Sequence, residues 1–103
     1  IRRQRQMCIR DSTYIACDGE RIVFKADLGA LFGGVAQVHG VWIDPAYRGR
    51  GLAAPFMRET AELIRRDHAP RVTLYVNSFN VRARRAYARA GFEPVGELAT
   101  VLF

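Results

Sequence analysis

The sequence has few cysteines and no long apolar run, and each shortage argues against a class of protein. Its two cysteines, Cys8 and Cys17, show neither CxxC nor Cys/His spacing, so we expect no metal site. No secretory segment is visible, and we therefore interpret both residues as free thiols in a reducing, cytoplasmic compartment. No apolar stretch approaches the roughly 20 residues that span a bilayer, which argues against a membrane protein.

The net charge is modest once its location is considered. The chain has 103 residues, 50% of them hydrophobic, which is enough for one small domain with a core. Its formal net charge is +6, and half of this excess comes from four arginines and one aspartate in residues 1–12. The remaining excess is too small to require a nucleic-acid partner.

Hydrophobic periodicity and turn residues predict strands and helices after residue 12. Short β-prone runs predict strands, and runs with a period of 3.6 residues predict helices. The predicted strands are 13–17, 21–28, 35–43, 71–76 and an extended segment 93–103 bent at Gly96, and the predicted helices are 52–67 and 81–90. The order β-β-β-α-β-α-β indicates an α+β fold with a mixed, mostly antiparallel sheet and two helices.

Two glycine-containing stretches flank the central strand 35–43. Residues 29–34 (GALFGG) precede it and predict a loop. The first half of the strand alternates, so Ala36 and Val38 share one face. Its end, Val41 to Ile43, is continuously apolar, which predicts burial on both faces.

A glycine-rich bend follows this strand and leads into the first helix. Gly49 and Gly51 allow sharp backbone turns, so several amides point into one concavity at the positive end of the helix dipole. Arg48 and Arg50 add full positive charges. The stretch fits neither the P-loop nor the dinucleotide fingerprint. It predicts a phosphate or diphosphate site, and the alternative is an ordinary loop with exposed arginines.

The second helix begins and ends at residues with clear capping preferences. Asn80 is a good N-terminal cap, and Gly91 is a good left-handed stop. Tyr87 lies seven residues after Asn80, two turns along the same face. A tyrosine there is either a core residue or, beside a thioester, a general acid. Periodicity alone favours the core.

Together, these two patterns resemble the GNAT superfamily of acetyl-CoA-dependent N-acyltransferases. Its diphosphate loop has Gln or Arg, Gly three residues later, and Gly or Ala two residues after that. Residues 48–53 (RGRGLA) fit every fixed position, after the lead IDPAY. The later family pattern is matched by Asn80, Ala83, Tyr87, Gly91 and Phe92. The resemblance covers about residues 35–103, and it is greatest to a bacterial subfamily with a poorly characterised, GNAT-like N-terminal half.

The resemblance implies a role for each matched residue. Acetyl-CoA would be the co-substrate, without a metal, and an amine would attack the thioester directly. Strand backbone would contact pantetheine and polarise the carbonyl, the loop amides would hold the diphosphate, and Tyr87 would protonate the CoA thiolate. The implied cofactor-binding residues are Val41, Trp42, Ile43, Arg48, Gly49, Arg50, Gly51, Leu52, Ala53 and Asn80.

One position departs from the family pattern. Many members carry a carboxylate base in the strand before the asparagine, where this chain has Tyr75. A phenol, with a reference pKa of about 10, is a poor base at neutral pH. His39 on the preceding strand, or a water chain to solvent, would have to serve instead.

The arginine-rich start of the chain has a separate explanation. Residues 2–12 (RRQRQMCIRDS) can be encoded by a transposase-based sequencing adapter with its mosaic end, read in frame. We therefore expect 1–12 to be a non-native, adapter-derived segment, and 13–103 to be a partial GNAT acetyl-CoA-binding domain from a longer parent. On this hypothesis the chain is an N-terminally truncated fragment that binds CoA weakly and transfers little acetyl. The alternative is a basic tail.

Three functions stay open at this point. The first is an amine acetyltransferase, with acetyl-CoA and an unidentified amine as partners, no nucleic acid or membrane, and a homodimer as an open alternative to a monomer. The second is a non-catalytic CoA-binding module, which the missing carboxylate at Tyr75 favours. The third is a basic nucleic-acid-binding domain, which would use the arginine-rich N-terminus together with Arg82, Arg84, Arg85 and Arg89. We expect these four to form a solvated helix face, of which one or two residues meet the 3′-phosphate of CoA.

Overall fold

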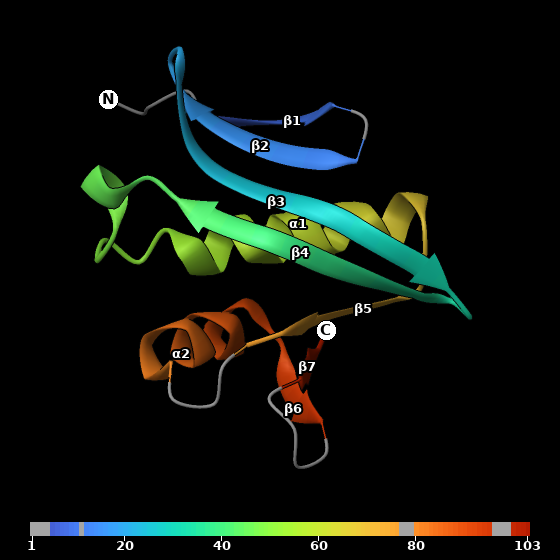
Figure 1. Ribbon diagram of the computed structural model, residues 1–103. Coiled ribbons are helices and arrows are strands. Elements are labelled where there is room, and N and C mark those ends of the chain that lie inside the picture. The colour runs from blue at the N-terminus through green and yellow to red at the C-terminus, as the bar shows by residue number, and fades with distance from the viewer. Residues whose placement is uncertain (1–4, 11, 77–79, 96–99) are drawn as a thin grey trace.

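Strands and helices follow one another along the chain in nearly the predicted order, and Figure 1 shows their arrangement. A computed structural model describes residues 5–10, 12–76, 80–95 and 100–103. The strands are β1 (Arg5–Arg10), β2 (Thr13–Asp18), β3 (Arg21–Phe32), β4 (Val35–Ile43), β5 (Arg71–Tyr75), β6 (Glu93–Val95) and β7 (Thr100–Leu102). The helices are the short 3-10 helix η1 (Pro45–Tyr47), α1 (Ala53–Asp67) and α2 (Val81–Ala90).

All seven described strands join one sheet in the order β1-β2-β3-β4-β5-β7-β6. The β4–β5 pair is parallel, because α1 forms the crossover between them, and the other described pairs are antiparallel. This arrangement confirms the predicted α+β class and the mixed, mostly antiparallel sheet.

The parallel pair separates before β4 ends. Pairing runs from Val35 opposite Arg71 to Val38 opposite Leu74, and β4 then continues alone on that side to Ile43. Figure 1 shows β4 and β5 close together near the β3–β4 turn and apart at their carboxyl ends. The last residues of β4 therefore keep β3 as a partner on one side, while among the described residues no strand pairs with their other side.

This separation corrects one expectation from the sequence. Val41 and Ile43 are half-buried and pack against the core, but Trp42 stays 37% exposed. The predicted burial of the whole segment on both faces is therefore wrong. The β3–β4 register is irregular between the pairs Lys25–Trp42 and Asp27–His39, where Gly40 has φ of 58°.

The core lies between the sheet and α1. The helix buries Ala54, Phe56, Met57, Thr60, Ala61 and Ile64. Phe56 meets Phe24 of β3 with ring centres 5.2 Å apart. Complete burial of side chains such as Phe56 and Ile64 contributes about 1.5–3 kcal/mol each. The helix also contacts α2, and the start of α1 lines the same cavity as the end of β4.

The second helix has the predicted bounds and caps. The Asn80 side chain accepts a hydrogen bond from the Ala83 amide, which satisfies one free donor of the first turn. Gly91 ends the helix in the left-handed region, with φ of 110°. Between these caps, α2 buries Ala86 and Tyr87.

Two boundaries differ from the sequence expectation. The predicted loop 29–34 is wrong for residues 29–32, because β3 continues to Phe32 and pairs with β4 as far as Val35. The turn needs only Gly33 and Gly34, which have φ of 56° and 76°. At the other end of the chain, the extended segment 93–103 contains β6 and β7, and the predicted bend at Gly96 lies outside the described residues.

Residues 5–10 form a strand within the segment expected to be adapter-derived. They pair antiparallel with β2, from Arg5 opposite Asp18 to Arg10 opposite Thr13. Pairing along a sheet edge uses backbone groups and accepts many sequences. The strand therefore says nothing about where the segment came from, and the adapter-derived origin stays a prediction.

Candidate functional site

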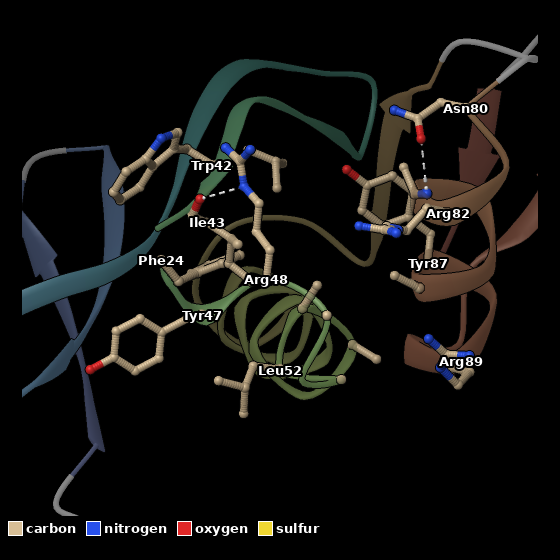
Figure 2. A pocket seen from close by; sticks show the side chains of 17 residues that line it. Phe24, Trp42, Ile43, Tyr47, Arg48, Leu52, Asn80, Arg82, Tyr87 and Arg89 are labelled. Atoms are coloured by element: carbon tan, nitrogen blue, oxygen red, sulfur yellow. Dashed lines mark hydrogen bonds between the residues drawn. The ribbon is translucent and has the colours of Figure 1, made fainter. Parts of the chain in front are cut away.

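A cavity of about 460 Å³ opens where β4 and β5 separate. Its walls come from the end of β4, the bend after it, the start of α1 and one face of α2, as Figure 2 shows. The volume is in the usual range for small-molecule sites. Of the residues predicted for the site, those that line the cavity are Val41, Trp42, Ile43, Arg48, Gly49, Gly51, Leu52, Ala53, Asn80 and Tyr87.

Arg50 is the predicted site residue that does not line the cavity. Its guanidinium lies over the ring of Tyr47, 5.2 Å from the ring centre. A cation over an aromatic face is attracted by the ring quadrupole, which gives this arginine a position beside the bend. The role of Arg50 in cofactor binding, which was expected through its amide and its charge, stays a prediction.

Gly49 and Gly51 give the bend its shape. Their φ angles are 77° and 72°, in the left-handed region that disfavours other residues. A Cβ atom at either position would meet nothing within 4 Å, so crowding does not require glycine there. The requirement comes from the backbone conformation, which costs an ordinary residue about 1–2 kcal/mol.

The amides of the bend fall into two groups. The Arg48 amide donates to the Pro45 carbonyl at 3.3 Å, so one of the donors predicted for the diphosphate is already engaged. Across the part of the chain that the structure describes, the next five amides, from residue 49 to residue 53, donate to no protein acceptor. The first turn of α1 also has no side-chain cap and no acidic residue. The bend thus combines free donors with the positive end of the α1 dipole, as an anion site requires.

Arg48 lies along the wall formed by β4. Its Nε donates to the Ile43 carbonyl oxygen at 3.1 Å, the contact drawn as a dashed line in Figure 2. The guanidinium charge is held at the end of β4 and lines the cavity. No acidic side chain lines the cavity among the described residues.

The side-chain amide of Asn80 caps α2 through its oxygen and offers its nitrogen as a donor. Its Oδ1 accepts from the Ala83 amide at 3.1 Å and so caps α2. Figure 2 shows the amide nitrogen on the side that faces β4. This nitrogen can donate to a carbonyl group in the cavity, while the oxygen keeps the helix capped.

Tyr87 belongs to both the core and the cavity. Only 9% of it is exposed, and its ring lies 5.9 Å from that of Phe92 between ring centres. Figure 2 shows its hydroxyl pointing away from α2 into the space before β4. Burial raises the pKa of this phenol above its usual value, since the charged form loses solvation. The hydroxyl therefore stays protonated, as a proton donor must.

The two residues considered as a base do not reach the cavity. Tyr75 is 63% exposed on β5 and is not part of the lining. His39 is also outside it, and its imidazole packs over Gly29, where a side chain would otherwise be. The structure brings the predicted acid to the cavity but neither candidate base.

Sequence reasoning did not assign several lining residues to the site. These are Phe24, Tyr47, Ala54, Ala83 and Ala86. Arg82 and Arg89 also line the cavity, and they belong to the four arginines of which one or two were expected to meet the 3′-phosphate. Arg82 and Arg89 are seven residues apart, so the helical period places them on one face, and this signal was available in the sequence. Phe24 comes from a strand far along the chain, so its place in the site depends on the tertiary fold.

The described residues contain neither a metal-binding cluster nor a helix that could span a membrane. These contain no cluster of three or more side chains suited to hold a metal ion. Within the same part of the chain, neither helix has the length and apolar character needed to cross a membrane.

Known proteins resemble this chain in sequence and in fold. The profile of the acetyltransferase (GNAT) family matches residues 3–92. A mycothiol acetyltransferase from Corynebacterium diphtheriae is 41% identical over 63 residues, covering 61% of this chain and 21% of that protein. A putative acetyltransferase structure from Thermoplasma acidophilum is 30% identical, with a TM-score of 0.71, covering 82% of this chain and 32% of that one.

A third comparison includes the coenzyme. The structure of an aminoglycoside acetyltransferase in complex with coenzyme A and kanamycin has a TM-score of 0.69 at 21% identity, covering 88% of this chain and 64% of that chain. This likeness concerns the fold alone. The chain spans about a fifth to a third of the length of the curated relatives it matches. The matched profile covers most of the sequence, and the chain belongs to the GNAT acetyltransferase family.

Proposed function

We propose that this protein binds acetyl-CoA in the cavity and transfers the acetyl group to an amine by direct attack. The observation that carries the proposal is the set of unengaged amides at residues 49–53, which open beside the same cavity as Asn80 and Tyr87. A diphosphate, a pantetheine arm and a thioester require these three features in that order along an extended ligand.

The cavity walls supply a partner for each part of the coenzyme. The amides and the α1 dipole suit the diphosphate, with Arg48 adding charge. Arg82 and Arg89 line the far wall and suit the 3′-phosphate. The free side of β4 after Val38 suits the amides of pantetheine, which would bond to it as a strand does.

The chemistry needs one proton donor. The amine nitrogen attacks the thioester carbonyl carbon, the carbon–sulfur bond breaks, and the departing thiolate takes the Tyr87 proton. A backbone N–H near Trp42 or Ile43 would polarise the carbonyl oxygen during the attack. The amine loses its own proton to solvent, because neither Tyr75 nor His39 lines the cavity, and Tyr87 regains a proton from solvent. No covalent enzyme intermediate is needed.

The acceptor is defined here only as an amine. The likeness to mycothiol acetyltransferases covers between 57% and 84% of this chain but between 18% and 33% of those proteins. The matched part contains the coenzyme motifs, so it supports the donor more strongly than any acceptor. Since acetyl-CoA is used inside cells, we place the protein in the bacterial cytoplasm, and a homodimer stays a prediction.

A second candidate function is a CoA-binding module without catalysis. The absence of any carboxylate or imidazole from the cavity lining, within the described residues, favours this candidate. Such a module would keep the diphosphate bend and release no CoA in the presence of an amine.

One experiment separates these candidates. Isothermal titration with CoA tests binding, and release of free CoA from acetyl-CoA over a panel of amines tests transfer. Binding with amine-dependent release supports the transferase. Binding without release with every amine supports the module, and no CoA binding at all refutes both.

A further inference from the structure

The segment from residue 44 to residue 53, called the diphosphate bend, is bonded to the β2–β3 hairpin. This hairpin contributes none of the family motif residues. We infer that Arg21 in this hairpin is a positioning residue for the coenzyme, acting through Asp44 and Tyr47. This inference rests on the proposed function, because the ligand whose affinity it controls is CoA. Neither Arg21 nor Asp18 lines the cavity, so the effect must pass through the bend.

Asp44 is the first fastening point. Arg21 donates to its two carboxylate oxygens, from Nε at 2.8 Å and from a terminal nitrogen at 3.1 Å. The Ala46 amide donates to the same carboxylate at 2.8 Å and caps η1. Asp44 is only 8% exposed, so its charge is held by a fixed set of donors. Paired bonds of this kind fix direction as well as distance.

Tyr47 is the second fastening point. Its hydroxyl donates to Asp18 Oδ2 at 2.9 Å. The guanidinium groups of Arg21 and Arg50 lie 5.5 Å and 5.2 Å from its ring centre. Arg21 therefore touches both fastened residues of the bend, and Tyr47 in turn holds Arg50.

The hydrogen bonds divide the diphosphate bend into two parts, a fixed stem (residues 44–48) and an open tip (residues 49–53). In the stem, the Asp44 amide donates to the Val23 carbonyl at 2.8 Å, and the Tyr47 amide donates to the Asp44 carbonyl at 2.8 Å. In the tip, residues 49–53, no amide donates such a bond within the described chain, although the Leu52 carbonyl accepts from the Phe56 amide at 3.2 Å. A fixed stem sets the direction of the tip amides before the ligand arrives, which lowers the entropic cost of binding.

If the stem positions the tip, a change in the stem should affect binding of only one part of the ligand. Loosening the stem should weaken affinity for the diphosphate and leave affinity for pantetheine unchanged, because pantetheine binds along β4 and α2. A general loss of structure would weaken both.

The test uses Arg21→Lys in the full chain, with Arg66→Lys as the matched control. Lysine keeps the charge but cannot make the paired bonds or stack as a guanidinium does. Arg66 makes a similar paired contact with Asp67, at the other end of α1. We expect Arg21→Lys to weaken CoA binding about tenfold, a loss of about 1.4 kcal/mol, with pantetheine affinity unchanged. We expect Arg66→Lys to change neither affinity.

A coupling measurement and a ligand-free measurement complete the test. Adding Arg21→Lys to Asp44→Asn should cause little further loss of CoA affinity if the two residues act as one unit. In the free protein, the amide resonances of Gly49 and Gly51 should shift in Arg21→Lys and stay in place in Arg66→Lys. Unchanged resonances, unchanged CoA affinity, or an equal loss for CoA and pantetheine would overturn the inference. Absence of CoA binding in the unaltered chain refutes the proposed function, and the resonances then still decide whether Arg21 positions the bend.

Discussion

Arg48 donates from Nε to the carbonyl oxygen of Ile43 at 3.1 Å, and this contact joins the diphosphate bend to the end of β4. Both residues line the cavity. The contact holds a positive charge beside the free amides of the bend before any ligand is bound. Charge and amides therefore act on the same anion.

The first prediction concerns the charge of Arg48. Replacing Arg48 with Ala should weaken CoA binding about tenfold, because a charge-assisted contact to phosphate is lost. The loss should shrink as salt rises, since mobile ions screen charges beyond about 10 Å at 0.1 M. Titration of CoA at low and high ionic strength checks this. An equal loss at both salt concentrations would show that Arg48 acts by packing rather than by charge.

The second prediction concerns the backbone at Gly51. Gly51→Ala should destabilise the fold by about 1 kcal/mol and weaken CoA binding, because alanine resists φ of 72°. Gly33→Ala is the matched control, since Gly33 also has positive φ and open space around it, but lies in the β3–β4 turn. Thermal unfolding and CoA titration of both variants check this. The account fails here if both variants lose CoA affinity equally.

The third prediction separates the two functions of Asn80. Asn80→Asp keeps the oxygen that caps α2 and removes the amide donor, so thermal stability should stay while CoA affinity falls. Asn80→Ala removes both and should also cost about 1 kcal/mol of unfolding free energy. Full CoA affinity in Asn80→Asp would mean that the side chain is a cap and nothing more.

The fourth prediction concerns the proton on Tyr87. Tyr87→Phe should lower the rate of acetyl transfer about 100-fold while CoA affinity stays, since a general acid contributes to the transition state rather than to binding. A parallel fall in CoA affinity would instead indicate a packing defect.

Tyr87 also leads to a prediction about the dependence of stability on pH. Burial raises the pKa of Tyr87 above its usual value of 10.0, so the folded protein favours the neutral phenol. This contribution to stability is fully present below the unfolded pKa of about 10, and it is lost as pH rises through the higher folded pKa. Ultraviolet difference spectra between the unaltered chain and Tyr87→Phe follow this one phenol. Ionisation at or below pH 10 would contradict the assignment.

The sequence predicted most elements and most of the cavity lining, for reasons that particular residues make clear. Asn80 and Gly91 act locally, through a side-chain cap and a left-handed backbone, and both bounds of α2 were correct. Gly49 and Gly51 likewise act through their own backbone angles. Local chemistry of this kind can be predicted from neighbouring residues alone.

The errors concern contacts between distant segments. Residues 29–32 resemble a loop locally, but pairing with β4 extends β3 through them. Trp42 lies in an apolar run, yet the separation of β4 from β5 leaves it partly exposed. In each case, a partner remote in sequence decides the outcome.

The central claim is that the free amides of the bend bind the diphosphate of CoA. The most direct measurement is a titration of the isotopically labelled chain with CoA, followed through the backbone amide resonances of residues 49–53. The account predicts that these resonances shift together on binding, and that pantetheine, which lacks the diphosphate, leaves them in place. Binding of CoA with these five resonances unmoved would contradict it.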